Sequence, residues 1–205
     1  MMNSFVVIDL ETTGFAAFKD EIIEIGAWKV KDGAVVDKFC TLVRPHIYVP
    51  VSIQNLTGIT MDDLADCEPI ESVLPEFHTW CEDLPFLGHS LQFDYGFLCA
   101  KGKPLGLDFT NNGRRTGIDT LSLSKKLLKL SNNKLCTVVD YFKIPISADK
   151  GGFHRGGYDA YMTKLVYDRF KYLYGNVLSV TTPELLDKTN KDYGEASIVD
   201  VLDFE

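Results

Sequence analysis

An apolar run that ends in two acids most constrains how this chain can fold. Residues 5–8 read Phe-Val-Val-Ile, and Asp9, Leu10 and Glu11 follow at once, before a Thr-Thr-Gly turn at residues 12–14. A short apolar run bounded by turn residues is typical of a buried central strand. Because side chains alternate between the two faces of a strand, Asp9 and Glu11 project from the same side. The stretch therefore predicts a buried strand with two carboxylates at its carboxyl end.

Two carboxylates that share one small volume need a compensating partner. Like charges about 4 Å apart near a protein surface repel by roughly 4 kcal/mol, so the pair is expected to be protonated, splayed or neutralised by a cation. Oxygen ligands on a rigid strand suit Mg²⁺ or Mn²⁺, whereas zinc prefers histidine and cysteine, which this stretch lacks. On this stretch alone, a strand that ends in solvated acids is an equally good reading.

Length and charge limit the classes of function. The chain has 205 residues, which suits one domain with a substantial core. Its formal net charge of −8 at pH 7 argues against a passive nucleic-acid coat, which is usually basic. The charge is uneven, with −11 over residues 1–100, +7 over residues 101–155 and −5 over residues 176–205. A basic middle could guide a phosphate backbone past a metal site, although solvated lysines on helix faces explain any single residue equally well.

Cysteine usage and hydropathy indicate the compartment. The five cysteines are widely spaced and include no Cys-x-x-Cys pair, so free thiols in a reducing cytoplasm are the simplest reading. No charged and then apolar leader precedes Phe5, and no apolar run approaches the roughly 18 residues of a membrane-spanning helix. We therefore expect a soluble, cytoplasmic protein that does not bind a membrane.

Turn residues and hydrophobic periodicity divide the rest of the chain into strands and helices. Four further stretches read as strands, at residues 21–30, 35–43, 84–89 and 118–121. Helical patterns cover residues 61–65, 70–82, 122–130, 134–142 and 158–174, and residues 90–98 read as a loop that enters a helix. Residues 44–60 read as largely irregular apart from a cap at Thr60. Strands first and strand–helix units later predict one α/β domain with a mixed sheet.

The last thirty or so residues differ from the rest. From Gly175 onward the sequence loses periodicity and becomes acidic, which predicts a domain over residues 1–175 and a frayed tail over residues 176–205. Residues 197–204 are apolar enough to dock on a partner, and this alternative stays open.

Further acids could join the first pair. Asp94 and Asp159 each follow a glycine-containing loop near the expected start of a helix, where the helix dipole eases ionisation. Asp119 ends a strand and is a rival candidate, because the sequence alone does not rank the three by position.

Two histidines lie near these acids. His154 precedes Asp159 by five residues in a loop, and a mobile histidine with a near-neutral pKa is suited to act as a general base. His89 has the same spacing to Asp94, so the pattern is weak by itself. For His89 we favour a hydrogen-bonded core histidine.

Three motifs together resemble a known family. They are Val-Ile-Asp-Leu-Glu-Thr-Thr-Gly at residues 7–14, His-Ser-Leu-Gln-Phe-Asp-Tyr-Gly-Phe-Leu at residues 89–98, and His-Arg-Gly-Gly-Tyr-Asp-Ala at residues 154–160, supported by Asp-Thr-Leu at residues 119–121. In this order and at domain-scale spacing, they resemble the DEDD 3′–5′ exonucleases of the histidine branch, which includes proofreading ε subunits of bacterial DNA polymerase III. The resemblance covers roughly residues 4–175.

The resemblance implies a fold and a metal site. The family fold is ribonuclease-H-like, a five-stranded mixed sheet flanked by helices. Two divalent cations, Mg²⁺ or Mn²⁺, would be held by four acids: Asp9, Glu11, Asp94 and Asp159. His154 would activate the attacking water, and Asp119 would be left with a structural role. Paired ions of this kind orient the water for in-line attack and stabilise charge on the leaving 3′ oxygen.

The resemblance also implies contacts to the 3′ nucleotide. These fall on Leu10, Thr12, Thr13 and Phe97, although for Phe97 a packed helix residue is an equally good reading.

The sequence departs from many relatives at three positions. It has Ser90 where they carry Asn, Thr57 where they carry His, and Gly156 where they carry Ala. None of these removes an expected ligand, but they affect how the terminal nucleotide is held, and Gly156 with Gly157 predicts a more mobile His154.

The function expected from this resemblance is removal of nucleoside 5′-monophosphates from DNA 3′ ends in proofreading or repair. The DNA would be single-stranded or frayed, and a DNA polymerase is a possible partner. A 3′–5′ exoribonuclease is one alternative, because the metal chemistry does not inspect the 2′ oxygen. A non-catalytic interaction module is another. Its mark would be loss of an acid or of His154, and all five residues are present.

Overall fold

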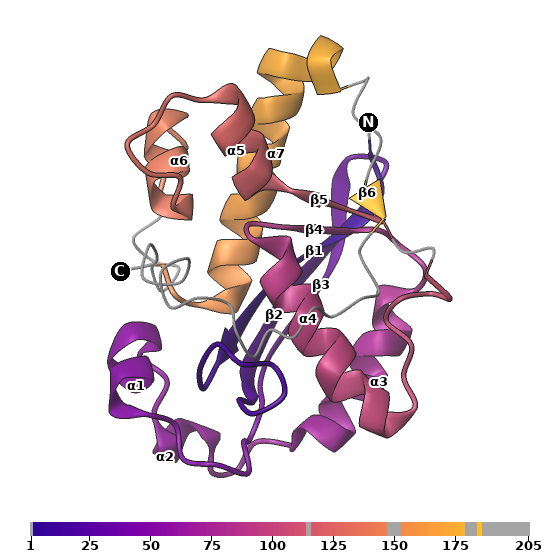
Figure 1. Cartoon of the computed structure of the whole chain (residues 1–205), viewed down its shortest axis with the longest axis vertical. Helices are drawn as coiled ribbons and strands as arrows, with labels where there is room; N and C mark the ends of the chain where they lie inside the picture. The colour runs from indigo at the N-terminus through magenta and orange to yellow at the C-terminus, as the bar shows by residue number, and fades with distance from the viewer. Residues whose placement is uncertain (1, 114–115, 147–152, 179–183, 186–205) are drawn as a thin grey trace.

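A mixed sheet in the strand order β3-β2-β1-β4-β5-β6 forms the centre of the computed structural model (Figure 1). The structure describes residues 2–113, 116–146, 153–178 and 184–185. The strands are β1 (Phe5–Thr12), β2 (Ile22–Lys31), β3 (Ala34–Leu42), β4 (Phe86–Gly88), β5 (Thr116–Asp119) and β6 (Glu184–Leu185). The helices are α1 (Val51–Thr57), α2 (Met61–Leu64), α3 (Ile70–Cys81), α4 (Leu91–Gly102), η1 (Lys103–Leu105), α5 (Thr120–Leu127), α6 (Leu135–Tyr141) and α7 (Gly156–Leu178).

Strand directions place the expected site residues at one edge of the sheet. β1 runs parallel to β4, and β4 runs parallel to β5, whereas β2 is antiparallel to both β1 and β3. The carboxyl ends of β1, β4 and β5 therefore meet at the same edge. In open α/β sheets, ligands bind at this edge.

Alternation along β1 directs its two acids toward α7. Val6, Ile8 and Leu10 belong to an apolar core shared with α3 and α4. Phe5 and Val7 belong to a second core, shared with α5, α6 and α7. Asp9 and Glu11 continue the row of Phe5 and Val7, because every second side chain lies on the same face. Figure 1 shows the long helix α7, in orange, beside the strands, with α5 and α6 close to it.

Most of the expected elements are present, with differences in the sheet and in the ends of two helices. The five expected strands form the sheet, and β6 adds a two-residue strand antiparallel to β5. α5 begins at Thr120, because Asp119 caps its start by accepting a hydrogen bond from the amide of Leu121. The helix ends at Leu127. α7 begins two residues earlier than expected and continues to Leu178, with a non-helical residue at Tyr174. The predicted tail at residues 176–205 lies outside the described residues, except for the end of α7 and β6.

The irregular segment expected at residues 44–60 contains a helix that the sequence reading missed. α1 covers Val51–Thr57 between Pro50 and Gly58, and Gly58 ends it in the left-handed conformation at a φ of 71°. The helix has only seven residues, so it is too short to show a clear apolar period. Its following turn packs Ile59 with Ile23, Val49 and Leu64 into a small third core under β2.

Among the helices of the described residues, none combines the length and the hydropathy needed to cross a membrane.

Candidate active site

Three carboxylates from two distant parts of the chain meet at the carboxyl end of β1. Asp9 and Glu11 come from β1, and Asp159 comes from the first turn of α7. One oxygen from each lies within 4.8 Å of the others. Asp9 and Glu11 remain partly exposed, whereas Asp159 is buried with 7% of its surface exposed. The structure thus brings together three of the four expected acids in one group.

Asp94 lies beside this group but not within it. β4 pairs with β1 only at Val6 and Val7, so it ends before it reaches Leu10. The carboxylate of Asp94, from the first turn of α4, accepts a hydrogen bond from the amide of Leu10 at 3.0 Å instead. Asp94 is buried, with 3% of its surface exposed, and its charge contributes to raising the pKa of both Asp9 and Glu11. The fourth acid is therefore fixed next to the other three.

Burial raises the pKa of all four carboxyls, and repulsion from neighbouring acids adds to it. Burial is the main cause for each of them, and for Asp9 the charges of Asp159, Asp94 and Glu11 add to it. Burial and the same kind of repulsion raise the pKa of Glu11 to about 8. Burial raises the pKa of Asp159 to about 7, although the hydrogen bond from the amide of His154 lowers it. Ionised carboxylates are therefore costly here without a cation.

The arrangement fits a divalent cation. Within the described ranges, none of the four carboxyls forms an ion pair with a lysine, an arginine or a histidine. The Oδ1 atom of Asp159 is buried without a hydrogen-bond partner among those residues, although buried polar atoms are normally paired. Clustered carboxylate oxygens are the ligands that hard divalent ions prefer. Asp9, Glu11 and Asp159 could hold such an ion directly.

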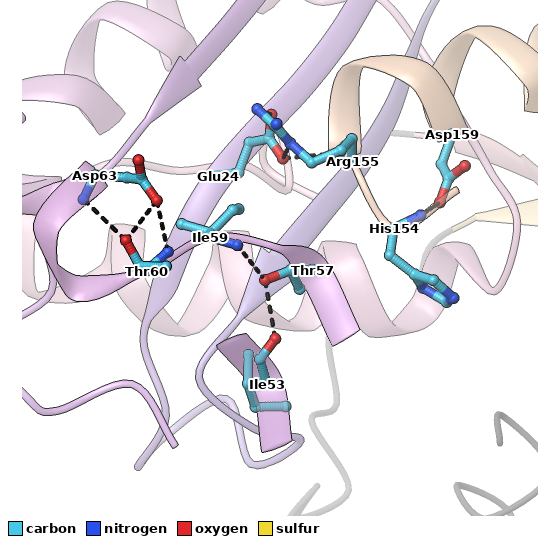
Figure 2. A network of polar contacts seen from close by, with 10 residues as sticks. Glu24, Ile53, Thr57, Ile59, Thr60, Asp63, His154, Arg155 and Asp159 are labelled. Atoms are coloured by element: carbon cyan, nitrogen blue, oxygen red, sulfur yellow. Dashed lines mark hydrogen bonds and ion pairs between the residues drawn. The ribbon is translucent and has the colours of Figure 1, made fainter. Parts of the chain in front are cut away.

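Polar side chains of β2 hold the first turn of α7 over the carboxylates. Glu24 is buried and pairs with Arg155 through two contacts of 3.2 and 3.3 Å, and it also accepts a hydrogen bond from the amide of Gly156 at 2.9 Å (Figure 2). The indole of Trp28 donates to the carbonyl of Gly157 at 2.7 Å. Sequence reasoning missed Glu24. The feature that could have drawn attention to Glu24 is its position as the one acid within the apolar run of residues 22–25.

Glycines on both sides allow the backbone of β2 to touch the backbone at the start of α7. A Cβ atom on Gly26 would lie 1.9 Å from the carbonyl carbon of Gly156. A Cβ atom on Gly156 would lie 2.8 Å from the carbonyl oxygen of Asp9. The structure thus gives Gly156, one of the departures noted in the sequence, a packing role against β1 and β2.

His154 lies at the edge of the site with its imidazole exposed. Its amide donates to Asp159 at 2.9 Å, and its backbone adopts a left-handed φ of 67°. Figure 2 shows the imidazole pointing away from the Asp159 carboxylate. Partial burial lowers the pKa of His154, and the charge of Lys134 lowers it further. The ring is therefore largely neutral near pH 7, as a proton acceptor must be.

A match to a family model decides the affiliation of the chain. The model described as an exonuclease, RNase_T, matches residues 6–167, which is more than half of the chain. The chain belongs to the RNase_T exonuclease family. The DNA polymerase III PolC-type protein of Thermotoga maritima is 42% identical to it over 170 residues, which cover 82% of this chain and 12% of that protein. The RNase_T chain therefore spans only a small part of this relative.

Solved structures agree with the RNase_T assignment at the level of the fold. Exonuclease X in complex with 5′ overhanging duplex DNA superposes with a TM-score of 0.68 at 23% identity, over 89% of this chain and 96% of that one. Escherichia coli Exonuclease I in complex with a dT13 oligonucleotide has a TM-score of 0.75 at 15% identity, over 87% of this chain and 43% of that one. The expected ribonuclease-H-like α/β fold is confirmed.

Asp119 and His89 have structural contacts in this RNase_T domain. One carboxylate oxygen of Asp119 accepts hydrogen bonds from the amides of Ser90 and Leu121, at 2.8 and 3.1 Å. The imidazole of His89 lies 2.9 Å from the hydroxyl of Thr120 and 2.8 Å from the carbonyl of Asn133. Burial lowers the pKa of His89. This placement matches the hydrogen-bonded core histidine that the sequence favoured.

The residues expected to contact the 3′ nucleotide are mostly enclosed. Leu10, Thr12 and Thr13 are 5%, 7% and 2% exposed. The hydroxyl of Thr12 donates to the carbonyl of Gly14, and that of Thr13 accepts from the amide of Glu21. Phe97 is 1% exposed and packs in the core of α3 and α4. For Phe97 this placement favours the packed-residue reading over a contact to substrate.

Proposed function

We propose that this chain is a metal-dependent 3′–5′ exonuclease that releases nucleoside 5′-monophosphates from DNA. The convergence of Asp9, Glu11 and Asp159, with a buried and unpaired oxygen on Asp159, carries the proposal. Membership of an exonuclease family supplies the reaction class. The catalytic domain would span residues 1–175.

The choice of DNA rests on the named relatives. The Thermotoga maritima relative is a DNA polymerase III PolC-type protein, and the superposed Exonuclease X and Exonuclease I structures hold DNA. We infer that this chain acts on single-stranded or frayed 3′ ends, with proofreading for a DNA polymerase as its setting. The site is the place where a phosphodiester would meet the carboxylates of β1, α4 and α7.

Each site residue has a distinct task in this proposal. Asp9, Glu11 and Asp159 hold divalent ions, Mg²⁺ or Mn²⁺, and Asp94 completes the ligand set from α4. When bound, two such ions supply a nucleophile at neutral pH and stabilise charge on the leaving oxygen. His154 takes the proton of the attacking water, for which its exposed imidazole must turn toward the carboxylates. Leu10 and Thr12 present backbone groups to the terminal nucleotide.

Digestion of oligonucleotides labelled at the 5′ end tests this function. With Mg²⁺ the label should appear in a ladder of products that shorten from the 3′ end, with nucleoside 5′-monophosphates released, and EDTA should stop the reaction. A matched RNA oligonucleotide separates the two nucleic acids. A rate on RNA that exceeds the rate on DNA by orders of magnitude would replace the DNA assignment with an exoribonuclease, and loss of the 5′ label first would refute the polarity.

A further inference from the structure

We propose that Glu24 and Arg155 form a positioning pair that holds Asp159 and His154 against Asp9 and Glu11. The inference rests on the proposed function and adds two residues to it. Neither residue belongs to the group of carboxylates that can share an ion. Their contacts instead tie the strand beside β1 to the start of α7, so they act through other residues.

The pair lies where the two halves of the site are joined. Glu24 and Glu11 are direct partners in the β1–β2 ladder, and Gly26 is the partner of Asp9. Glu24, Gly26 and Trp28 share one face of β2, because side chains two residues apart project on the same side. All three meet the Arg155–Gly157 segment, through an ion pair, a backbone contact and an indole hydrogen bond. The start of α7 is thus fixed directly over the acids of β1.

Arg155 lies in the sequence between His154, the proposed base, and Asp159, the proposed metal ligand. His154 precedes it, and Asp159 follows four residues later, about one turn into α7. The amide of His154 donates to Asp159 at 2.9 Å, so the two ends of this turn are themselves linked. A shift of Arg155 would therefore move the proposed base and the proposed metal ligand together (Figure 2).

The burial and hydrogen bonding of Glu24 distinguish this pair from an ordinary surface ion pair and favour a positioning role. The carboxylate of Glu24 is 7% exposed and receives three hydrogen bonds, two from the guanidinium of Arg155 and one from the amide of Gly156. A two-pronged contact between arginine and a carboxylate fixes orientation as well as charge. A buried carboxylate beside Glu11 would add to the repulsion at the site, and Arg155 neutralises it. The pair therefore places α7 without adding net charge to the carboxylate cluster.

Calorimetric titration of the full chain with Mn²⁺ tests the pair without relying on nuclease activity. Arg155→Ala and Glu24→Ala should weaken Mn²⁺ binding by roughly 10–100-fold, as residues that orient metal ligands do. Glu24→Gln keeps an acceptor for the amide of Gly156, and Arg155→Lys keeps the charge but not the two-pronged geometry. Both should give smaller losses. These two variants carry the test if the alanine variants do not fold.

The matched control is Asp168→Asn, which breaks the ion pairs of Asp168 with Lys164 and Lys171 on the same helix, away from the carboxylates. It should leave Mn²⁺ binding unchanged. In DNA digestion, the positioning variants should lower kcat and raise the Mg²⁺ concentration needed for half-maximal rate, with KM for DNA unchanged. Wild-type Mn²⁺ affinity in all four variants would overturn the proposal, as would a change in KM for DNA alone, which would make Arg155 a substrate contact.

The two proposals fail in different ways. A wild-type chain that binds Mn²⁺, loses affinity in the variants and cleaves no DNA would refute the DNA exonuclease function and leave the positioning pair intact. A wild-type chain that binds no Mn²⁺ would overturn both.

Discussion

Glu11 and Glu24 face each other directly across the antiparallel β1–β2 ladder, next to the pair of Asp9 and Gly26. Like charges in directly opposed positions destabilise a sheet, and here the charges of Asp159 and Asp94 add to the repulsion at Glu11. Arg155 forms an ion pair with Glu24, whereas Glu11 forms no ion pair within the described residues, and the charge of Arg155 only partly offsets the effects that raise the pKa of Glu11. The sheet therefore contains a negative site that is only partly compensated, and a bound cation would complete it.

Replacing Asp9 should separate catalysis from stability. Asp9→Asn removes a partly exposed carboxyl from a group of like charges, so we expect Mg²⁺-dependent nucleotide release to fall by more than roughly 100-fold. In EDTA at neutral pH, the Tm should stay the same or rise, because the repulsion with Asp159 and Asp94 is relieved. Asp140→Asn, on an exposed face of α6, is the control and should change neither property. A wild-type rate for Asp9→Asn would contradict the assignment.

Stability without divalent ions should fall as pH rises. The pKa values of Glu11 and Asp159 in the folded chain are about 8 and about 7, above the ordinary values of 4.5 and 3.8. Between the unfolded and folded pKa values, the folded chain binds protons that the unfolded chain has released. The free energy of unfolding therefore decreases with pH over this window, by at most about 1.4 kcal/mol per pH unit for each carboxyl that changes protonation.

Denaturant titrations in EDTA between pH 5 and 9 measure this effect, and the decrease should continue to at least about pH 8, where Glu11 is still half protonated. Saturating Mg²⁺ should reduce the decrease, because it stabilises the ionised folded state. Stability that rises through this range in EDTA would show that the carboxyls are not mutually destabilised.

His154 should affect the rate and its pH dependence but not metal binding. His154→Asn tolerates the left-handed backbone at this position, and it should lower kcat by roughly 100-fold or more, the usual contribution of a general base. The acidic limb of the pH–rate profile should disappear, while Mn²⁺ affinity stays the same. His89→Ala should instead lower stability, by roughly 1–3 kcal/mol, because it leaves buried partners unpaired. Loss of catalysis in folded His89→Ala with an unaffected His154→Asn would reverse the assignment of the base.

Two adjacent glycines at the start of α7 should respond in opposite ways to alanine. A Cβ atom on Gly156 would lie 2.8 Å from the carbonyl oxygen of Asp9, so the backbone must shift, and we expect a loss of roughly 1–3 kcal/mol. A Cβ atom on Gly157 would meet the Sγ atom of Cys40 at 2.9 Å, and that side chain can rotate. Gly157→Ala should be neutral or stabilising by up to about 1 kcal/mol through helix propensity. Urea unfolding measures both, and equal effects would contradict the close approach of the two backbones.

The sequence predicted the features that depend on local pattern. The apolar run and its two acids gave β1 and the face on which Asp9 and Glu11 lie, because the alternation of side chains is a property of any strand. Local patterns made Asp94, Asp159 and His154 candidates, and the family motifs selected them over Asp119 and His89. All three lie at or beside the site. α1 was missed because Val51–Thr57 is too short to show a period.

The features that depend on long-range packing could not be predicted. Glu24 and Arg155 are 131 positions apart, and only the docking of α7 on β2 brings them together. The role of Gly156 depends on the same contact, since an isolated helix would favour alanine there. The burial of Phe97 likewise follows from how α4 packs. Whether Phe97 contacts the substrate or packs in the core could therefore be decided only from the structure.

Anomalous diffraction from crystals soaked in Mn²⁺ tests the central claim most directly, because it locates the ions without reference to activity. The account predicts Mn²⁺ density coordinated by oxygens of Asp9, Glu11 and Asp159, with the Oδ1 atom of Asp159 among the ligands. Saturating Mn²⁺ that leaves these three carboxylates free of metal, with Asp159 Oδ1 still unliganded, would contradict it.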